Sequence, residues 1–179
     1  MGMDVLGKAP RSETGKYFRN NVWFWRPLAD YCLKVAPDIC AACEGWHFND
    51  GDGLDAKGSM ELAEALDLEL ATGRTLDYER RYREMVAALP NVTCRLCNGT
   101  GIRSDAVGVQ HKMTVRVCEG VDSHEFHGEP HPRAGKEGWC NGCNGRGYVK
   151  HDAASYPFSA ENVEEFVAFL RDCGGFEIC

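Results

Sequence analysis

The sequence predicts an α+β protein, a mainly helical domain that carries a zinc-stapled β insertion at residues 91–150. Two observations support this fold class. Apolar residues recur at helical spacing in four segments outside the insertion. Inside it, two cysteine pairs flank a segment in which apolar and polar residues alternate, as they do in a strand. Because 179 residues suit one domain, we expect residues 1–179 to fold as a single domain.

The first two helices are expected from their apolar stripes and their end signals. The first follows Pro27, which suits a first helical turn, and reaches Val35 before Pro37 ends it. The second covers about residues 56–71, and Asp55 has the side chain of a helix cap.

Two further helices are expected later in the chain. The third covers about residues 76–89 and ends before Pro90. The fourth begins after Ser159 and ends at Gly174–Gly175.

Strand signals are concentrated in the insertion. Apolar residues alternate with polar ones from Lys112 to Cys118. Short strands are also expected at residues 102–103 and 148–149, beside the cysteine pairs. Together these segments would form the β part of the insertion.

The chain carries 20 Lys and Arg against 27 Asp and Glu, a formal net charge of −7. A dedicated nucleic-acid binder is usually basic, so this balance argues against that class of protein. No apolar run is long enough to span a bilayer, and the first residues lack the apolar core of a secretion signal. We therefore expect a cytoplasmic protein with no membrane partner.

Six of the ten cysteines occur as C-x-x-C pairs. In a chain without an export signal, such pairs indicate metal binding before disulfides. The pairs are Cys40/Cys43, Cys94/Cys97 and Cys140/Cys143.

The second and third pairs share the longer pattern C-x-x-C-N-G-x-G, at residues 94–101 and 140–147. Two such pairs supply four thiolates, the tetrahedral ligand set that Zn²⁺ prefers. The glycines permit the positive φ angles of a sharp turn, which aims N–H groups at the sulfurs. We expect one structural Zn²⁺ with no open position for catalysis. Its expected ligands are Cys94, Cys97, Cys140 and Cys143.

This repeated pattern resembles the zinc-binding module of the J-domain co-chaperones, in which four repeats build two zinc sites. The resemblance implies zinc held by the four cysteines and a role in contacting polypeptide or nucleic acid. The J-domain's His-Pro-Asp tripeptide is absent, and His131-Pro132-Arg133 is the nearest match, so stimulation of a partner chaperone is not implied. The motif is also similar to that of some phage antitermination factors, which are basic. As a whole, the chain resembles uncharacterised proteins of bacteria and their phages, a resemblance that implies no activity.

Two other groups of residues are candidates for a second metal site. Cys40, Cys43 and His47 have the spacing C-x₂-C-x₃-H, and the alternative is that the cysteines are small buried residues at a helix end. The insertion also contains several imidazoles beside a thiol, and the alternative there is a histidine-bearing loop. That second group is Cys118, His124, His127 and His131.

The Asp/Gly-rich segment at residues 49–55 has two interpretations. Its carboxylates do not occupy the positions of an EF-hand calcium loop. The segment is therefore either a tight turn that caps the second helix or a loop that presents Asp50 and Asp52 to a ligand.

Three functions compete. The first is a zinc-stabilised non-enzymatic binding protein for a protein or a small nucleotide-like ligand, acting as an inhibitor or sequestering factor in phage–bacterium conflict. Its expected ligand site joins an aromatic and arginine-rich segment to the Asp/Gly loop. The expected residues are Arg19, Trp23, Arg26, Trp46, His47, Asp50 and Asp52.

The second function is nucleic-acid binding by the basic residues around the cysteine pairs. The third is an enzyme in which His47 acts with Asp50 or Asp52 as acid and base, although no nucleophile or cofactor fingerprint is present. The enzyme hypothesis is less favoured than a binding protein. The sequence does not predict the oligomeric state. The basic residues of the second hypothesis are Arg95, Arg103, Arg146 and Lys150.

Overall fold

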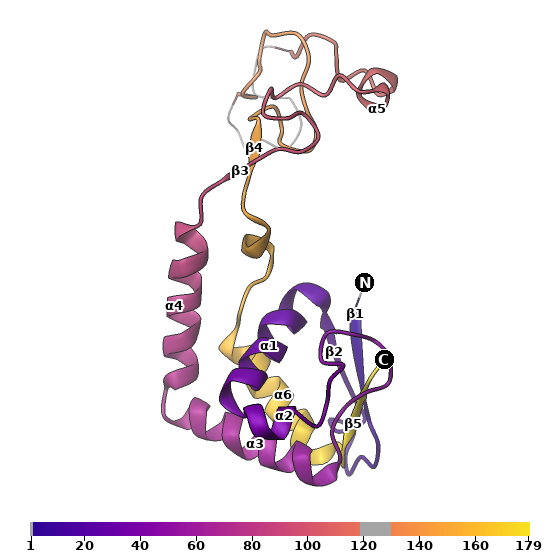
Figure 1. Ribbon diagram of the computed structural model, residues 1–179, viewed down its shortest axis with the longest axis vertical. Helices are drawn as coiled ribbons and strands as arrows, with labels where there is room; N and C mark the ends of the chain where they lie inside the picture. Colours follow the sequence, from indigo (N-terminus) through magenta and orange to yellow (C-terminus); the bar gives the residue numbers. More distant parts are fainter. Residues whose placement is uncertain (1, 119–129) are drawn as a thin grey trace. The chain divides into compact units, whose positions relative to one another are not determined.

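The computed structural model describes residues 2–118 and 130–179 (Figure 1). They form two compact units, one made of residues 1–88 and 153–179 and the other of residues 89–152. The second unit extends two residues beyond each end of the insertion expected at 91–150. The expectation that the whole chain is a single domain stays a prediction.

The first unit contains a three-stranded antiparallel sheet in the order β2-β1-β5. The strands are β1 (Gly2–Gly7), β2 (Tyr17–Asn21) and β5 (Phe176–Ile178). In β1, Val5 lies opposite both Phe18 and Ile178, and all three side chains are buried. The sequence analysis missed this sheet, because its strands are short and β5 comes from the far end of the chain.

Helix α1 (Val22–Val35) begins five residues before Pro27, so the expected start was wrong. The side chain of Asn21 accepts hydrogen bonds from the N–H groups of Trp23 and Phe24, which caps the helix at this earlier point. Pro27 therefore lies inside the helix. A single turn, α2 (Pro37–Cys40), follows.

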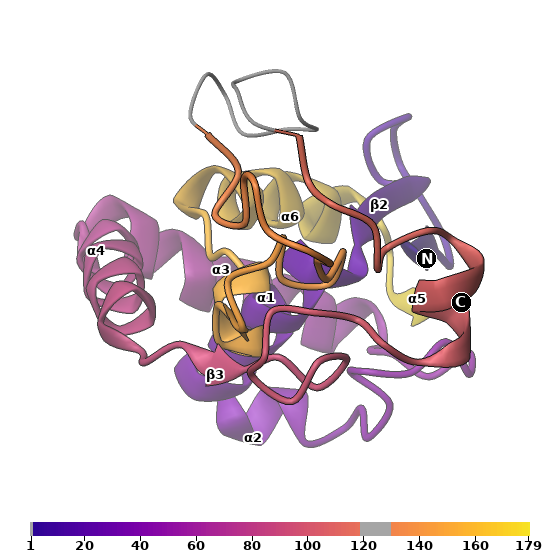
Figure 2. The same ribbon diagram turned by 90° about the horizontal axis from the view of Figure 1, so that it is seen from above.

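The other three expected helices form within two residues of their expected limits. They are α3 (Ala56–Ala71), α4 (Arg74–Ala88) and α6 (Ala160–Asp172). Asp55 and Ser159 cap α3 and α6 by accepting hydrogen bonds from Gly58 and Asn162. Figures 1 and 2 show α3 and α6 side by side, with α1 packed against both and α4 at the edge of the group.

An aromatic cluster forms the centre of this unit. Trp25 lies with its ring centroid 6.2 Å from that of Trp46 and 5.8 Å from that of Phe166, while Trp46 and Phe176 are 5.8 Å apart. Both buried indoles are hydrogen-bonded: Trp25 donates to the Trp46 carbonyl at 2.6 Å and Trp46 donates to the Cys40 carbonyl at 3.1 Å. The core therefore ties α1 and α6 to the loop that follows α2.

The second unit contains little regular structure. Strands β3 (Val92–Thr93) and β4 (Tyr148–Val149) form an antiparallel ribbon, and α5 (Ala106–Gln110) is a short helix. The strand expected at residues 148–149 is present, whereas none forms at 102–103. A 3₁₀ turn, Asp152–Ser155, follows the ribbon.

The regular strand expected at residues 112–118 is wrong. Backbone hydrogen bonds join this segment to residues 135–139, but only Arg116 and Glu137 form a bridge. Gly135 and Gly138 in the facing segment both have a φ of +70°, which interrupts the extended backbone that a ladder requires. In the described part of the insertion, the regular strands are consequently limited to the β3–β4 ribbon, and most of the backbone forms turns and loops.

Among the described residues, no helix combines the length and the apolar character needed to cross a membrane.

The close approach of the loop at residues 52–54 to β5 gives a test of the first unit. A Cβ added to Gly53 would lie 2.0 Å from the carbonyl oxygen of Phe176. We predict that Gly53→Ala lowers the free energy of unfolding by about 1–3 kcal/mol, measured by chemical denaturation. Gly2→Ala is the control, because its Cβ would meet no atom closer than 3.5 Å. Equal stability of the two variants would contradict this packing.

Candidate metal centre

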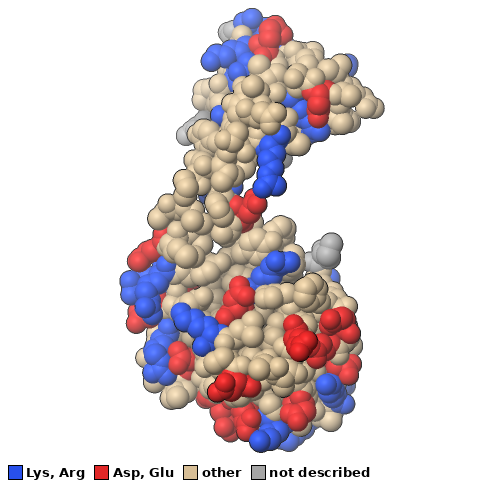
Figure 3. All heavy atoms as spheres, in the orientation of Figure 1, with Lys and Arg blue, Asp and Glu red and all other residues tan. Residues whose placement is uncertain are grey.

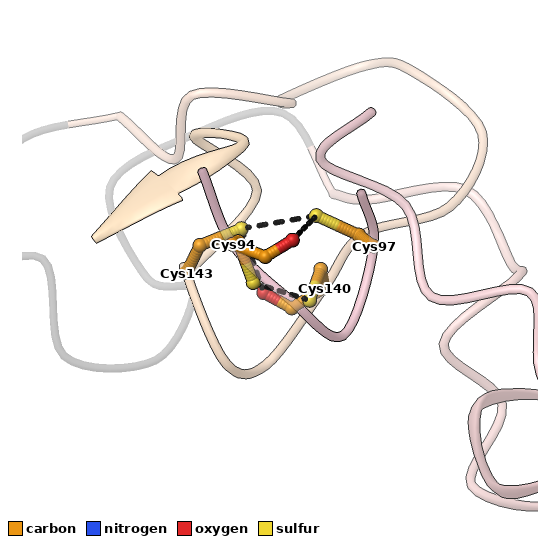
Figure 4. Close-up of side chains that lie close together, drawn as sticks. All are labelled: Cys94, Cys97, Cys140 and Cys143. Atoms are coloured by element: carbon orange, nitrogen blue, oxygen red, sulfur yellow. Dashed lines mark hydrogen bonds between the residues drawn. The ribbon is translucent and has the colours of Figure 1, made fainter. Parts of the chain in front are cut away.

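Four buried cysteines converge in the second unit. Figure 4 shows their sulfurs pointing toward one another from two loops. The Sγ atoms of Cys94 and Cys140 are 3.9 Å apart, those of Cys97 and Cys143 are 3.7 Å apart, and all four lie within 4.8 Å of one another. Each C-x-x-C pair thus contributes two sulfurs to one cluster.

The two loops repeat the same backbone conformation. Asn98 and Asn144 have φ angles of 47° and 50°. The two glycines of each N-G-x-G segment also have positive φ; they are Gly99 and Gly101 in the first loop and Gly145 and Gly147 in the second. This turn brings the N–H of Gly101 to within 3.3 Å of the Cys97 sulfur and the N–H of Gly147 to within 3.2 Å of the Cys143 sulfur. The N-G-x-G segments therefore serve the same purpose in both repeats, which is to aim a donor at a sulfur.

The last glycine of each repeat is also required by close packing between the loops. A Cβ on Gly101 would lie 2.4 Å from the Gly145 carbonyl oxygen, and a Cβ on Gly147 would lie 2.3 Å from the Gly99 carbonyl oxygen. Any side chain at either position would separate the loops. The glycines thus hold the two cysteine pairs at the distance that one cluster requires.

The donors around Cys97 favour its thiolate. Burial raises the pKa of this thiol, but the N–H of Gly101, the side chains of Cys143 and Cys94 and the N–H of Gly99 together lower the pKa to about 7. A thiolate is the form that binds a metal ion. At Cys140 and Cys143 burial dominates instead, which raises the pKa of Cys140 to about 12 and that of Cys143 above its ordinary value, so the preference for the thiolate is confined to Cys97 among these three.

The cluster can hold a metal ion. Four sulfurs placed about 2.3 Å from a tetrahedral Zn²⁺ would be about 3.8 Å from one another. The Cys94–Cys140 and Cys97–Cys143 sulfur distances, 3.9 and 3.7 Å, match this value. Because four protein sulfurs complete a tetrahedral set, no position remains for water or a substrate.

The structure does not bring Cys40, Cys43 and His47 together as metal ligands. Within residues 2–118 and 130–179, the four-sulfur cluster is the only group of three or more side chains placed to hold a metal ion. Burial, followed by the effect of Asp52, raises the pKa of Cys43 to about 12, so this thiol stays protonated. His47 instead places Nε2 3.1 Å from a carboxylate oxygen of Asp30.

The second candidate group is described only in part. His124 and His127 lie outside the described residues. His131 is buried, with its ring 5.6 Å from that of Trp139, while Cys118 is exposed.

The expected ligand residues lie in three separate environments. Trp23 is 47% exposed, its ring centroid is 5.0 Å from that of Tyr156, and the guanidinium of Arg26 lies 5.8 Å from the Tyr156 ring. Arg19 lies on the sheet, 3.8 Å from the carboxylate of Asp4. Tyr156 was not among the expected residues, because no periodic pattern marks it in the sequence.

The residues expected from the Asp/Gly loop are largely engaged in holding the fold. Trp46 is only 2% exposed and belongs to the core, so its ring is not available to stack on a ligand. Asp52 accepts hydrogen bonds from the N–H groups of Glu44 and Gly45 at 2.7 and 2.8 Å, and Asp50 accepts one from the N–H of Asp52. In the described part of the chain, no hydrogen bond, ion pair or ring contact joins Trp23 or Arg26 to these residues. The expected ligand site, which joined the aromatic segment to the Asp/Gly loop, therefore separates into two parts. One is a surface around Trp23, and the other is a turn whose carboxylates bond to its own backbone.

Comparisons with protein-family models, curated proteins and solved structures found no match to this chain. The resemblance to the J-domain co-chaperones therefore rests on the cysteine and glycine pattern alone.

Replacement of one cluster cysteine tests the metal centre. We predict about one zinc per purified chain, and we expect Cys97→Ser to lose the metal and the folding of residues 89–152, because an incomplete sulfur set binds the ion far more weakly. Elemental analysis and amide hydrogen exchange measure the two effects. Cys118→Ser is the control, since this exposed cysteine belongs to the same unit. Full zinc content in Cys97→Ser would exclude the assignment, and a loss in Cys118→Ser would indicate a second ion.

The Asp52 hydrogen bonds predict a pH dependence of stability. The N–H groups of Gly45, Gly53 and Glu44 lower the pKa of Asp52 below its ordinary value of 3.8. A carboxyl whose pKa is lower in the folded state stabilises the protein above its unfolded pKa, and this contribution disappears as the pH falls through the folded pKa.

We therefore predict that Asp52→Asn lowers the free energy of unfolding by about 1 kcal/mol at pH 7 and by much less at pH 3. The value at pH 7 is below that of a buried charged hydrogen bond, because solvent screens the exposed carboxylate. Urea denaturation at both pH values measures the difference, with Asp50→Asn as the control. A cost that does not change with pH would show that the charge of Asp52 is not involved.

Proposed function

We propose that the protein is a non-catalytic binding protein in which one Zn²⁺, held by Cys94, Cys97, Cys140 and Cys143, folds the unit of residues 89–152. The observation that carries the proposal is the pair of sulfur–sulfur distances, 3.9 and 3.7 Å, in a buried set of four. Zinc would supply coordination energy for folding here and nothing for catalysis, because protein sulfurs fill all four positions.

The surface around Trp23 is the proposed ligand site. It combines an exposed indole with the ring of Tyr156 and the guanidinium of Arg26. In residues 2–118 and 130–179, no carboxylate forms an ion pair with Arg26. A flat aromatic ring stacks well on an indole, and an anionic group pairs well with a guanidinium. These two features fit a small nucleotide-like ligand.

The enzyme hypothesis has less support. His47 is paired with Asp30 through Nε2, and its other ring nitrogen, Nδ1, is buried without a hydrogen-bond partner in the described structure. A buried nitrogen cannot reach a substrate as a general base. The Asp52 carboxylate is similarly occupied by backbone N–H groups. A binding protein of this kind would act by sequestering its ligand or by inhibition, rather than by turnover.

A titration tests the ligand site. We predict that the full chain binds adenosine 5′-monophosphate more tightly than adenosine in isothermal titration calorimetry, because only the nucleotide carries a phosphate for Arg26. Arg26→Ala should weaken binding of the nucleotide about tenfold and leave adenosine binding unchanged. Trp23→Ala should weaken both.

Arg80→Ala is the matched control, because it removes an exposed arginine of α4 in the same unit. Zinc content and thermal melting of each variant establish that the fold is intact. Equal nucleotide affinity of Arg26→Ala and the unaltered chain, or no binding at millimolar concentration, would overturn the proposed site.

A further inference from the structure

We propose that the solvent-facing side of the β3–β4 ribbon binds single-stranded nucleic acid. This surface lies in the metal-binding unit and goes beyond the small-ligand site proposed around Trp23, which lies in the other unit. The inference rests on how the ribbon divides its residues between two faces.

One face of the ribbon is directed toward the metal centre. Val92 lies opposite Val149, and Val149 packs against the four cysteines. Cys94 continues the same face and is itself a member of the cluster. The N–H of Cys94 bonds to the carbonyl of Gly147, so the pairing extends one step beyond β3.

The opposite face is exposed and carries an aromatic ring between cations. Tyr148 lies opposite Thr93 and is 48% exposed. Arg146 and Lys150 stand two residues before and after Tyr148 in the chain, Arg146 in the turn that precedes β4, and Arg95 follows Thr93 by two residues at the start of the first cysteine loop. All three cations are exposed.

The charge around this face is positive although the chain as a whole is acidic. No Asp or Glu occurs from residue 138 to residue 151. Figure 3 shows Lys, Arg, Asp and Glu in both units, and residues 89–152 together carry eight Lys and Arg against seven Asp and Glu. The net charge of −7 therefore does not describe this surface.

The structure changes the set of basic residues that the sequence suggested. Only 13% of the Arg103 side chain is exposed, and it is bonded to Asp105 and Asn141, so this arginine holds the loops together. Arg133 likewise donates to the carbonyls of Gly138 and Glu137. Arg103 leaves the proposed surface and Tyr148 joins it.

An exposed ring flanked by cations suits a single strand better than a duplex. Unpaired bases can stack on a tyrosine ring, while the cations follow the phosphates. A duplex offers only stacked bases and would use the cations alone. Stacking on Tyr148 is therefore the feature that should distinguish the two nucleic-acid forms.

Fluorescence anisotropy of a labelled twelve-nucleotide dT strand, with the zinc-loaded full chain, tests the proposal. We expect Tyr148→Ala to bind roughly tenfold more weakly and Tyr148→Phe to bind like the unaltered chain, because phenylalanine keeps the stacking face. The loss in Tyr148→Ala should be nearly independent of salt.

Two double variants distinguish the effect of the cations beside the ribbon from the effect of positive charge elsewhere in the same unit. Arg95→Gln/Lys150→Gln removes two cations of the ribbon, and we expect it to reduce the slope of log affinity against log salt by about 1.4. Lys112→Gln/Lys136→Gln removes two exposed cations from elsewhere in the same unit and should change the affinity less than twofold.

Three results would overturn the proposal: no binding of the dT strand at low salt, equal losses in the two double variants, or equal affinity for a twelve-base-pair duplex. Zinc content and thermal melting establish that each variant is folded. Arg26→Ala should bind the dT strand normally, so a failure of the small-ligand site and a failure of this surface give different results.

Discussion

The convergence of four cysteine sulfurs is the interaction on which the unit of residues 89–152 depends. Apart from these cysteines, Val117 is the only apolar residue of the unit that is buried in the described structure. A unit of this size with so little apolar burial cannot offset the entropy of ordering its chain by the hydrophobic effect. Coordination of a metal ion by the cluster, as proposed above, would supply the missing folding energy.

The other unit is stabilised in a different way. Its core joins aromatic rings from α1, α6 and β5, and its sheet pairs β1 with β5. Hydrogen bonds between Asp4 and Cys179 extend that pairing. Since this core uses none of the cluster cysteines, loss of the metal should unfold one unit and spare the other. The two proposed binding surfaces would then respond differently to a chelator.

The sequence predicted those features whose physical cause is local. The repeated C-x-x-C-N-G-x-G pattern contains both the ligands and the glycines that position them, and α3 follows directly from its stripe and the Asp55 cap. Long-range contacts could not be read in this way. Pairing of β1 with β5 was missed, and Trp46 was taken for a ligand residue although the core covers it. The sequence alone does not indicate whether a given aromatic side chain will lie in the core or on the surface.

The most direct test of the metal centre is X-ray absorption spectroscopy at the zinc edge of the purified protein. A closed centre made by the four cysteines predicts four sulfur neighbours at about 2.3 Å and no lighter ligand. A spectrum that requires a nitrogen or oxygen neighbour in place of one sulfur would contradict it, because the ion would then have an exchangeable position or another ligand.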